Sequence, residues 1–279
     1  MFLFFLIVVC FFCGSSWSQI GPLRGIYISS HAIGQGRSDQ LISDLLAAGG
    51  NTIVFDVKDR RGHLSYESEV PLAQQIGASR WKTLDDPVST VKRWQERGIY
   101  VIARMTCFYD ILLAEERPEW VPLSKTGGLW GENASLNWVD PSHSESQQYL
   151  IDLAVEVSSL GVDEIQLDYV RFPTEGDLED AIFSVNTEQQ TKDLIITKFV
   201  QDVRSTLRPL GVRLSIDIFG VTAWGQKVDA LRLGQDVKEL IKYVDAVSPT
   251  VSYTHLRANE TREDLGFRLM LEKKKGGGG

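Results

Sequence analysis

Residues 161–173 read Gly-Val-Asp-Glu-Ile-Gln-Leu-Asp-Tyr-Val-Arg-Phe-Pro, a pattern typical of a β-strand that opens into a polar crevice. Two aliphatic residues alternate with Gln166 and Asp168, so a strand here directs its aliphatic side chains to one face and an amide and a carboxylate to the other. An ionised carboxylate is costly to bury without partners, and Arg171 follows before the proline that breaks the strand. Two interpretations of Asp168 fit this stretch, a structural ion pair that closes the strand and a catalytic carboxylate.

Strand-like and helix-like segments alternate on both sides of this stretch. The strand candidates are 25–29, 52–58, 100–108, 164–170, 213–219 and 246–250, and helical patterns fall at 38–48, 86–97, 144–160, 188–207 and 236–243. Repeated βα units predict a parallel sheet, either a barrel or an open doubly wound sheet. No Gly-x-Gly-x-x-Gly follows the first strand and no Gly-Lys-Ser/Thr occurs, so nucleotide-binding versions of the open sheet lack support and a barrel is favoured.

The sequence predicts an α/β fold of the (β/α)8 TIM-barrel type that is incomplete. About six βα units fit before Val251, and the residues after it cannot hold two more units of roughly 30 residues each. From Val251 onward the sequence resembles the translation of a sequencing adapter and ends in runs of Lys and Gly. We therefore predict a barrel domain at 22–250 and a non-native tail at 251–279.

The first residues predict export. Residues 2–13 are uninterruptedly apolar, and the small residues Ser16 and Ser18 suit a signal peptidase, so residues 1–18 are predicted to be a signal peptide. The apolar run is short of the roughly 20 residues of a membrane span, but no Lys or Arg precedes it, which leaves an uncleaved membrane anchor open. The expected location is secreted or in the cell envelope. Cys107 would be the one cysteine of the mature chain, so no internal disulfide is expected.

The net charge of −8 argues against nucleic acid as a partner and fits neutral or cationic material.

Polar residues recur on the inward face of five predicted strands. Reading each strand by alternation directs one set of side chains toward the centre, namely Tyr27, Asp56, Lys58, Arg104, Asp168 and Asp217. Strands of a parallel sheet are normally near-continuous apolar runs, and a barrel carries its active site at the C-terminal ends of its strands. The sequence therefore favours an active site, and the alternative is a structural network in which Asp56, Lys58, Arg104 and Asp168 satisfy one another.

Aromatic residues gather in the connections on the same side. Residues 109–143 are expected to form a long loop that carries Trp130 and Trp138, and Trp224 follows the fifth strand. Loops this long in a compact domain are usually functional. These three tryptophans are candidate sugar-binding residues, and the alternative is that Trp138 packs its loop onto the barrel.

Five blocks of the chain resemble a known family. They are Thr-Ile-Val-Phe-Asp-Val-Lys-Asp (52–59), Tyr-Val-Ile-Ala-Arg-Met-Thr-Cys-Phe (100–108), Asn-Trp-Val-Asp-Pro (137–141), residues 161–173, and Leu-Ser-Ile-Asp-Ile-Phe-Gly (214–220). Together they resemble the putative glycosyl hydrolase domain of bacterial proteins, over about residues 22–250. This family is assigned to glycoside hydrolase-like barrels related to the α-amylase and α-galactosidase groups. The resemblance implies a barrel and a hydrolase of O-glycosidic bonds. In related barrels the fourth strand ends in a nucleophilic Asp, a place that Asp168 occupies, and Asp217 matches a fifth-strand position for the acid/base partner.

Glycoside hydrolysis needs one ionised and one protonated carboxyl group. Asp168, with Arg171 or Arg104 nearby, suits the ionised role, and Asp217, flanked by isoleucines, suits a raised pKa and the acid role. The expected substrate is an extracellular or cell-wall polysaccharide or an oligosaccharide, with no cofactor and no metal. Its predicted contacts are Tyr27, Asp56, Lys58, Arg104, Tyr169, Arg171, Trp130, Trp138 and Trp224.

Two other functions stay open at this point. One is a non-catalytic glycan-binding barrel in which the charges hold a polysaccharide and no bond breaks. The other is a metal-dependent lyase or isomerase with Lys58 as base beside Asp56 and Asp168, which is less favoured because no histidine accompanies them. The histidines His31, His63 and His143 are expected to be loop residues.

Overall fold

A curled, mostly parallel sheet forms the centre of the computed structural model, which describes residues 22–132, 135–185, 190–220, 222, 231–250 and 269–270. The predicted signal peptide, most of the predicted tail and Trp224 lie outside the described residues. Six strands run parallel in chain order: β1 (Gly25–Ile28), β2 (Thr52–Lys58), β3 (Tyr100–Thr106), β5 (Glu164–Asp168), β7 (Arg213–Phe219) and β8 (Ala246–Thr250). A two-residue strand, β9 (Leu269–Met270), pairs antiparallel with β8.

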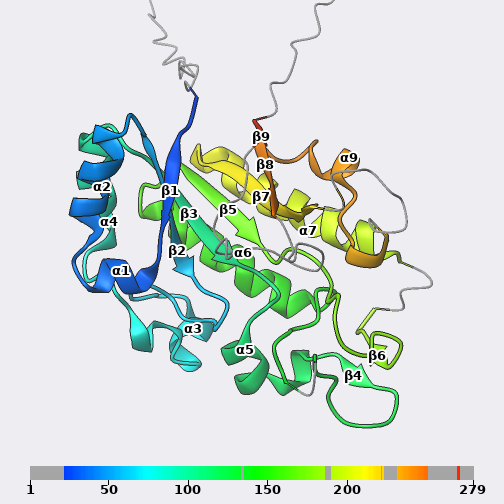
Figure 1. Ribbon diagram of the computed structural model, residues 1–279. Coiled ribbons are helices and arrows are strands. Elements are labelled where there is room, and N and C mark those ends of the chain that lie inside the picture. The colour runs from blue at the N-terminus through cyan, green and yellow to red at the C-terminus, as the bar shows by residue number, and fades with distance from the viewer. Residues whose placement is uncertain are drawn as a thin grey trace, which may run out of the picture.

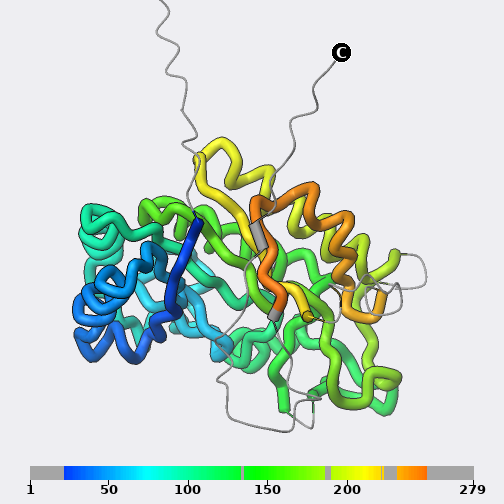
Figure 2. The backbone as a smooth tube through the Cα atoms, turned by 45° about the horizontal axis from the view of Figure 1, so that its top comes forward, coloured from blue at the N-terminus to red at the C-terminus, as the bar shows by residue number. Residues whose placement is uncertain are grey.

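Helices cover the outer side of this half-barrel (Figure 1). The helices between successive strands are α2 (Ser38–Ala47), α4 (Pro87–Glu96), α6 (Ser144–Ser159), α7 (Lys192–Leu207) and α9 (Val237–Leu240). Figure 2 shows the first strands and helices, in blue and cyan, on one side of the molecule and the last ones, in yellow and orange, on the other, as a sheet built in chain order requires. Among the described residues, no helix combines the length and the apolar character needed to cross a bilayer.

The alternation of β2 explains why its outer face is buried under helices. Ile53, Phe55 and Val57 are fully buried, and the Phe55 ring packs edge-on against Trp94 of α4 with 5.4 Å between ring centroids. Helix α4 begins where the Asp86 side chain accepts a hydrogen bond from the Ser89 amide. Each strand thus buries one apolar face against its helices and leaves the other face for polar residues.

The predicted fold is confirmed, and the strand bounds agree within two residues. The prediction of one long loop at 109–143 is wrong, because this segment folds locally. It contains α5 (Ile111–Glu116), the 3₁₀ turn η2 (Pro118–Trp120) and β4 (Leu123–Ser124), which pairs antiparallel with β6 (Ala181–Ile182).

Shorter elements lie at the end of the sheet to which the strand arrows point in Figure 1. They include α1 (Ser30–Gly34) after β1, and α3 (Pro71–Gln75) and the 3₁₀ turn η1 (Ala78–Trp81) after β2. Another 3₁₀ turn, η3 (Arg208–Leu210), is not one of them and connects α7 to β7. Strand pairing aligns Asp56 of β2 with Arg104 of β3, and Arg104 with Gln166 of β5. Parallel strands in this register bring their inward polar residues to one place.

Candidate active site

Arg104 of β3 lies at the centre of an acidic cluster, which we define as Asp56, Arg104, Asp168 and Asp217. Its Nη1 donates to Asp56 Oδ1 at 2.7 Å, its Nη2 and Nε both donate to Asp168 Oδ2, and its Nε lies 3.9 Å from Asp217 Oδ2. Burial alone disfavours the charge, but the carboxylates of Asp168, Asp56 and Asp217 together raise the pKa of Arg104 well above its usual range. One permanent cation therefore organises three carboxyl groups.

Asp168 is the last residue of β5 and is held by donors on both oxygens. Arg104 binds Oδ2, with Nε at 3.1 Å, and the amide of Tyr169 donates to Oδ1 at 2.6 Å. Tyr169 has a φ of 51°, a left-handed conformation that non-glycine residues rarely adopt. Because such a conformation persists only where the surroundings enforce it, the turn after β5 fixes the carboxylate in one orientation.

Asp217 lies within β7 and is almost completely buried. The Gln166 side-chain amide donates to Asp217 Oδ1 at 2.5 Å and lies 3.2 Å from Ser248 Oγ. Burial, and then the negative charge of Asp168, raise the pKa of Asp217 well above its ordinary value, against the opposing effects of Arg104 and Gln166. The predicted raised pKa is confirmed in direction, and burial is its largest cause.

Asp168 and Asp217 are neighbours across two strands. Leu167 pairs with Ile216, so the two aspartates occupy the next position on adjacent strands, which lie about 4.8 Å apart in a sheet. Their Oδ2 atoms are no farther apart than 7.0 Å, the sum of 3.1 and 3.9 Å from the shared Arg104 Nε. The site therefore places two carboxyl groups close together, and one of them, Asp217, has a raised pKa.

The remaining side of the cluster is formed by Tyr27 and Asp56. The Tyr27 hydroxyl donates to Asp56 Oδ2, and the Arg104 guanidinium lies 6.0 Å from the centroid of the Tyr27 ring. Burial raises the pKa of Asp56, while Arg104 and Tyr27 act in the opposite direction. The structure thus brings together five of the predicted site residues, which are Tyr27, Asp56, Arg104, Asp168 and Asp217.

With this geometry in view, residues 25–263 match the family described as a putative glycosyl hydrolase domain. The chain belongs to this family. The crystal structure of a hypothetical protein from Ruminiclostridium thermocellum ATCC 27405 is 35% identical, over 69% of this chain and 96% of that one, with a TM-score of 0.61. No curated protein matches the sequence.

More distant structures share the fold. A family 20 exo-β-N-acetylglucosaminidase from Vibrio harveyi is 16% identical over 70% of this chain and 35% of its own, with a TM-score of 0.50. A maltogenic α-amylase from Thermotoga neapolitana is 17% identical over 81% of this chain and 48% of its own, with a TM-score of 0.50. The chain therefore spans half or less of these enzymes, and the likeness shows a TIM-barrel glycoside hydrolase fold. Membership of the glycosyl hydrolase domain family supports an enzyme of the glycosidase type.

Lys58 does not join the acidic cluster of this glycosyl hydrolase domain. The strand register shifts between Asp56 and Lys58, and the Lys58 Nζ lies 2.6 Å from Asp110 Oδ2 and donates to the Thr106 carbonyl at 2.8 Å. Both side chains of the Lys58–Asp110 pair are fully buried. The expectation that Lys58 lies with Asp56 and Asp168 is wrong, because its ammonium is buried against Asp110 and the Thr106 carbonyl.

The tryptophans of the 109–143 segment pack this segment rather than line a cleft. Trp130 is 3% exposed and its Nε1 donates to the Asp177 carbonyl at 2.7 Å. Trp138 is 2% exposed and lies edge-on to Tyr109 with 5.2 Å between ring centroids, with Tyr169 beside it at 5.9 Å. The predicted sugar-stacking role of these two residues does not fit their burial, and the packing interpretation of Trp138 does.

Arg171 lies among aromatic rings and is not the partner of Asp168. Its guanidinium lies 4.9 Å from the Trp138 centroid, 5.4 Å from Tyr169 and 5.2 Å from Phe219, and burial lowers its pKa. Among the described residues, no carboxylate lies within 4.0 Å of Arg171. Of the two arginines predicted to lie near Asp168, Arg104 makes the ion pair in the described part of the chain.

Sequence reasoning missed several polar residues around the cluster. Gln166 and Ser248 hold Asp217, and the buried Glu164 accepts from the hydroxyls of Ser215 and Tyr100. The signal for Gln166 and Glu164 was present, because they share the inward face of β5 with Asp168. Ser248 could be found by the same reading of β8.

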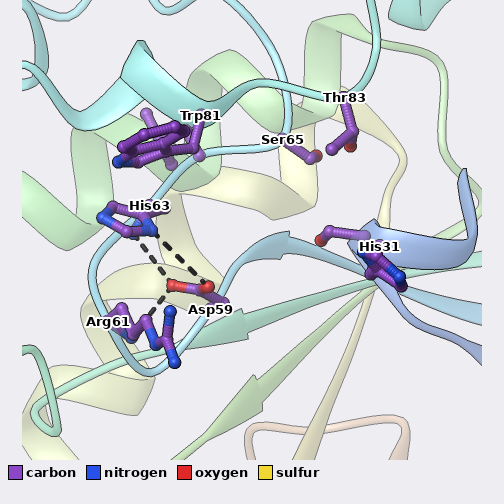
Figure 3. Close-up of a pocket in the computed structure, with 9 residues that line it drawn as sticks. His31, Asp59, Arg61, His63, Ser65, Trp81 and Thr83 are labelled. Carbon is purple, nitrogen blue, oxygen red and sulfur yellow. Dashed lines mark hydrogen bonds and ion pairs between the residues drawn. The ribbon is translucent and has the colours of Figure 1, made fainter. Parts of the chain in front are cut away.

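A pocket of about 430 Å³ (Figure 3) includes Ser30 in its lining, and the Ser30 hydroxyl lies 3.5 Å from the carbonyl oxygen of the cluster residue Asp56. We call it the Trp81 pocket, and its lining residues are Ser30, His31, Asp59, Arg61, His63, Leu64, Ser65, Trp81 and Thr83. His31 belongs to α1, which corrects the expectation of a loop, and His63 lies in the turn after β2. Trp81 is 62% exposed, and nothing in its sequence surroundings indicates this.

Proposed function

We propose that this domain hydrolyses O-glycosidic bonds, with Asp217 as general acid and Asp168 as nucleophile. One observation carries the proposal, the opposite surroundings of two carboxyl groups on neighbouring strands. Asp217 is buried with a raised pKa, whereas Asp168 is bound by Arg104 and the Tyr169 amide. Pairs of carboxyl groups whose environments separate their protonation states divide the acid and nucleophile roles in glycosidases.

The reaction follows from these roles. The Asp168 carboxylate forms a bond to the anomeric carbon while the bond to the leaving oxygen breaks, and that oxygen takes the Asp217 proton. Water then attacks the same carbon, gives its proton to Asp217 and releases Asp168. The upper bound of 7.0 Å between the two Oδ2 atoms is compatible with this retaining route, which uses carboxyl groups roughly 5 Å apart.

Arg104 acts as a positioning residue in this proposal. Its Nε contacts Asp168 and lies 3.9 Å from Asp217, so it sets the orientation of both groups. Asp56 and Tyr27 would contact the sugar bound at the cleaved bond, since they complete the cluster on the opposite side of Arg104.

The proposed substrate is an extracellular or cell-wall polysaccharide or an oligosaccharide. Family membership supports a carbohydrate, and the predicted signal peptide at residues 1–18 supports export.

The proposal is tested by incubating the protein with a panel of aryl glycosides and soluble polysaccharides. Hydrolysis is measured as the release of phenol or of reducing ends. Asp168→Asn and Asp217→Asn should each lower kcat by about 100- to 10,000-fold. Asp152→Asn is the matched control, because Asp152 is exposed on α6, and it should keep the wild-type rate. Full activity of Asp168→Asn would overturn the proposal.

A non-catalytic glycan-binding barrel is the second candidate, favoured by the engagement of all three cluster carboxylates with Arg104. Such ion pairs also serve structure alone. Glycan binding that survives both aspartate variants, without product from any protein of the series, would select this candidate.

A further inference from the structure

We propose that the Trp81 pocket is a second sugar-binding site, which holds a neutral glycosyl unit of the substrate away from the bond that is cleaved. The inference rests on the proposed function for the identity of the substrate, but its geometry is independent of the acidic cluster. It assigns a role to side chains that the reaction itself does not use.

The pocket lies next to the acidic cluster along the chain and in space. Asp59 follows Asp56 by three residues, which span at most about 10 Å. Ser30 lines the pocket, and its hydroxyl lies 3.5 Å from the Asp56 carbonyl oxygen. A substrate several sugar units long that is cleaved at Asp168 can therefore reach the pocket with another unit.

Trp81 offers an exposed aromatic ring to such a unit, with the Arg80 guanidinium 5.5 Å from the ring centroid. It ends the turn η1, which is anchored by the fully buried Ala78, and it keeps 62% of its surface exposed. Tryptophan is normally highly buried, so this exposure needs a reason. The Trp81 ring and the His63 ring lie 6.3 Å apart on one side of the pocket, and His31 lies on the other side (Figure 3). Ligand pockets of this size combine aromatic surface with a few polar groups that fix orientation.

Two unpaired hydroxyl groups line the same pocket. Ser65 Oγ and Thr83 Oγ1 are buried and have no hydrogen-bond partner in the part of the chain that the structure describes. The two residues are adjacent, since the Thr83 amide donates to the Ser65 carbonyl at 2.9 Å. Buried polar side chains nearly always have hydrogen-bond partners, so two unpaired hydroxyl groups in one pocket point to a ligand as their partner. A sugar hydroxyl can both donate and accept a hydrogen bond, so it can pair with either group.

The charges of the pocket favour a neutral ligand. Asp59 and Arg61 are its one acidic and one permanently basic residue, so neither sign dominates. Asp59 Oδ1 is occupied by the amides of Arg61 and His63, each at 2.9 Å, which leaves the second oxygen for a ligand. This oxygen lies 3.9 Å from His63 Nδ1.

The wall of the pocket is rigid before any ligand binds. The turn 59–63 is closed by the Asp59 amide, which donates to the His63 carbonyl at 3.0 Å. Gly62 within it has a φ of +85°, and a Cβ there would lie 2.1 Å from Asp110 Oδ1. Asp110 is in turn fixed by Lys58, so the buried ion pair supports the pocket. A preformed site loses less entropy when it binds.

The test compares long and short ligands in Trp81→Ala, Trp81→Phe and Ser65→Ala. The probes are six-unit malto-, cello-, chito- and galacto-oligosaccharides, with the matching aryl monoglycosides. Trp81→Ala should weaken binding of the best six-unit ligand by about 2- to 12-fold, measured by calorimetry, and raise KM for it more than for the aryl glycoside. Trp81→Phe should recover part of the loss.

Ser65→Ala should weaken binding of the long ligand without loss of protein stability, because the Ser65 hydroxyl has no protein partner among the described residues. Leu194→Ala, on an exposed residue of α7, should leave both ligands unaffected.

The outcomes separate this inference from the proposed function. Binding of a six-unit ligand that Trp81→Ala weakens, with no hydrolysis by the wild type, would keep the pocket and overturn the proposed reaction. Hydrolysis that Trp81→Ala and Ser65→Ala leave unchanged on long ligands, or impair equally on long and short ones, would overturn the pocket. Failure of every six-unit ligand to bind would overturn it as well.

Discussion

The acidic cluster and the Trp81 pocket lie side by side at the C-terminal ends of the strands, yet different parts of the backbone build them. Strands carry every member of the cluster, so its side chains are spaced by the sheet; Asp56 and Asp217 are buried, and burial is the largest cause of their raised pKa values. Turns and short helices carry the pocket, whose main surface is an exposed ring. Chemistry that needs perturbed protonation states lies where strands impose burial, and recognition lies where loops leave surface open.

The largest expected effect comes from removing the cation at the centre of the cluster. Arg104→Met leaves three carboxyl groups without their shared partner, so the free energy of unfolding at neutral pH should fall by about 3–5 kcal/mol and activity should be lost. Urea unfolding measures the first effect. Arg93→Met is the control, because its pair with Asp39 is exposed and such pairs contribute about 0–1 kcal/mol. If both variants lose a similar small amount of unfolding free energy, Arg104 contributes no more to stability than an arginine in a surface ion pair.

The next effect separates chemistry from recognition. Asp217→Asn should lower kcat by about 100- to 10,000-fold with little change in KM, because the variant cannot donate a proton to the leaving oxygen. Substrates with strongly acidic leaving groups, which need less protonation, should lose less. Steady-state kinetics on aryl glycosides of graded leaving-group acidity measures this, and an equal loss on all of them would argue against Asp217 as the acid.

A smaller effect is expected at the wall of the Trp81 pocket. Gly62→Ala puts a methyl group against Asp110 and should destabilise the protein by about 1–3 kcal/mol beyond Gly98→Ala, because Gly98 has a similar φ but nothing within 4 Å of the place its methyl group would take. The same variant should weaken long ligands, because the turn 59–63 forms a pocket wall. Thermal unfolding and calorimetric titration give the two quantities. Equal stability of the two alanine variants would mean that the turn is not held against Asp110.

Sequence alone predicted the cluster far better than the pocket. Alternation along strands has a fixed period of two, so Tyr27, Asp56, Arg104, Asp168 and Asp217 could be directed inward without any knowledge of contacts. The prediction that Lys58 joins the cluster was wrong because the strand register shifts after Asp56, and alternation along the sequence does not reveal such a shift.

The pocket had no comparable signal in the sequence. Trp81 was not singled out, whereas Trp130 and Trp138 were and proved to be buried. Segments outside strands and helices have no period that relates sequence to exposure, and their side chains are placed by long-range contacts such as the one between Gly62 and Asp110.

The last prediction uses the pH dependence of stability to contrast a strand carboxyl group with a surface one. Burial, and then the charge of Asp168, raise the pKa of Asp217 well above 3.8, so the folded protein keeps this proton at pH values where the unfolded chain has lost it. Its contribution to stability is therefore complete below 3.8 and is lost as pH rises toward the raised pKa. Asp217→Asn has no proton to lose at this position, so its free energy of unfolding should rise relative to that of the wild type as pH increases, with a slope of about 1.4 kcal/mol per pH unit between the two pKa values.

Asp86 provides the control of opposite sign. Hydrogen bonds from the Ser89 side chain and amide lower its pKa, so Asp86→Asn should fall behind the wild type as pH rises toward 3.8 and keep a constant deficit above it. Urea unfolding from about pH 3 to pH 8 measures both trends, and parallel curves for Asp217→Asn and the wild type would mean that Asp217 is not held protonated by its surroundings.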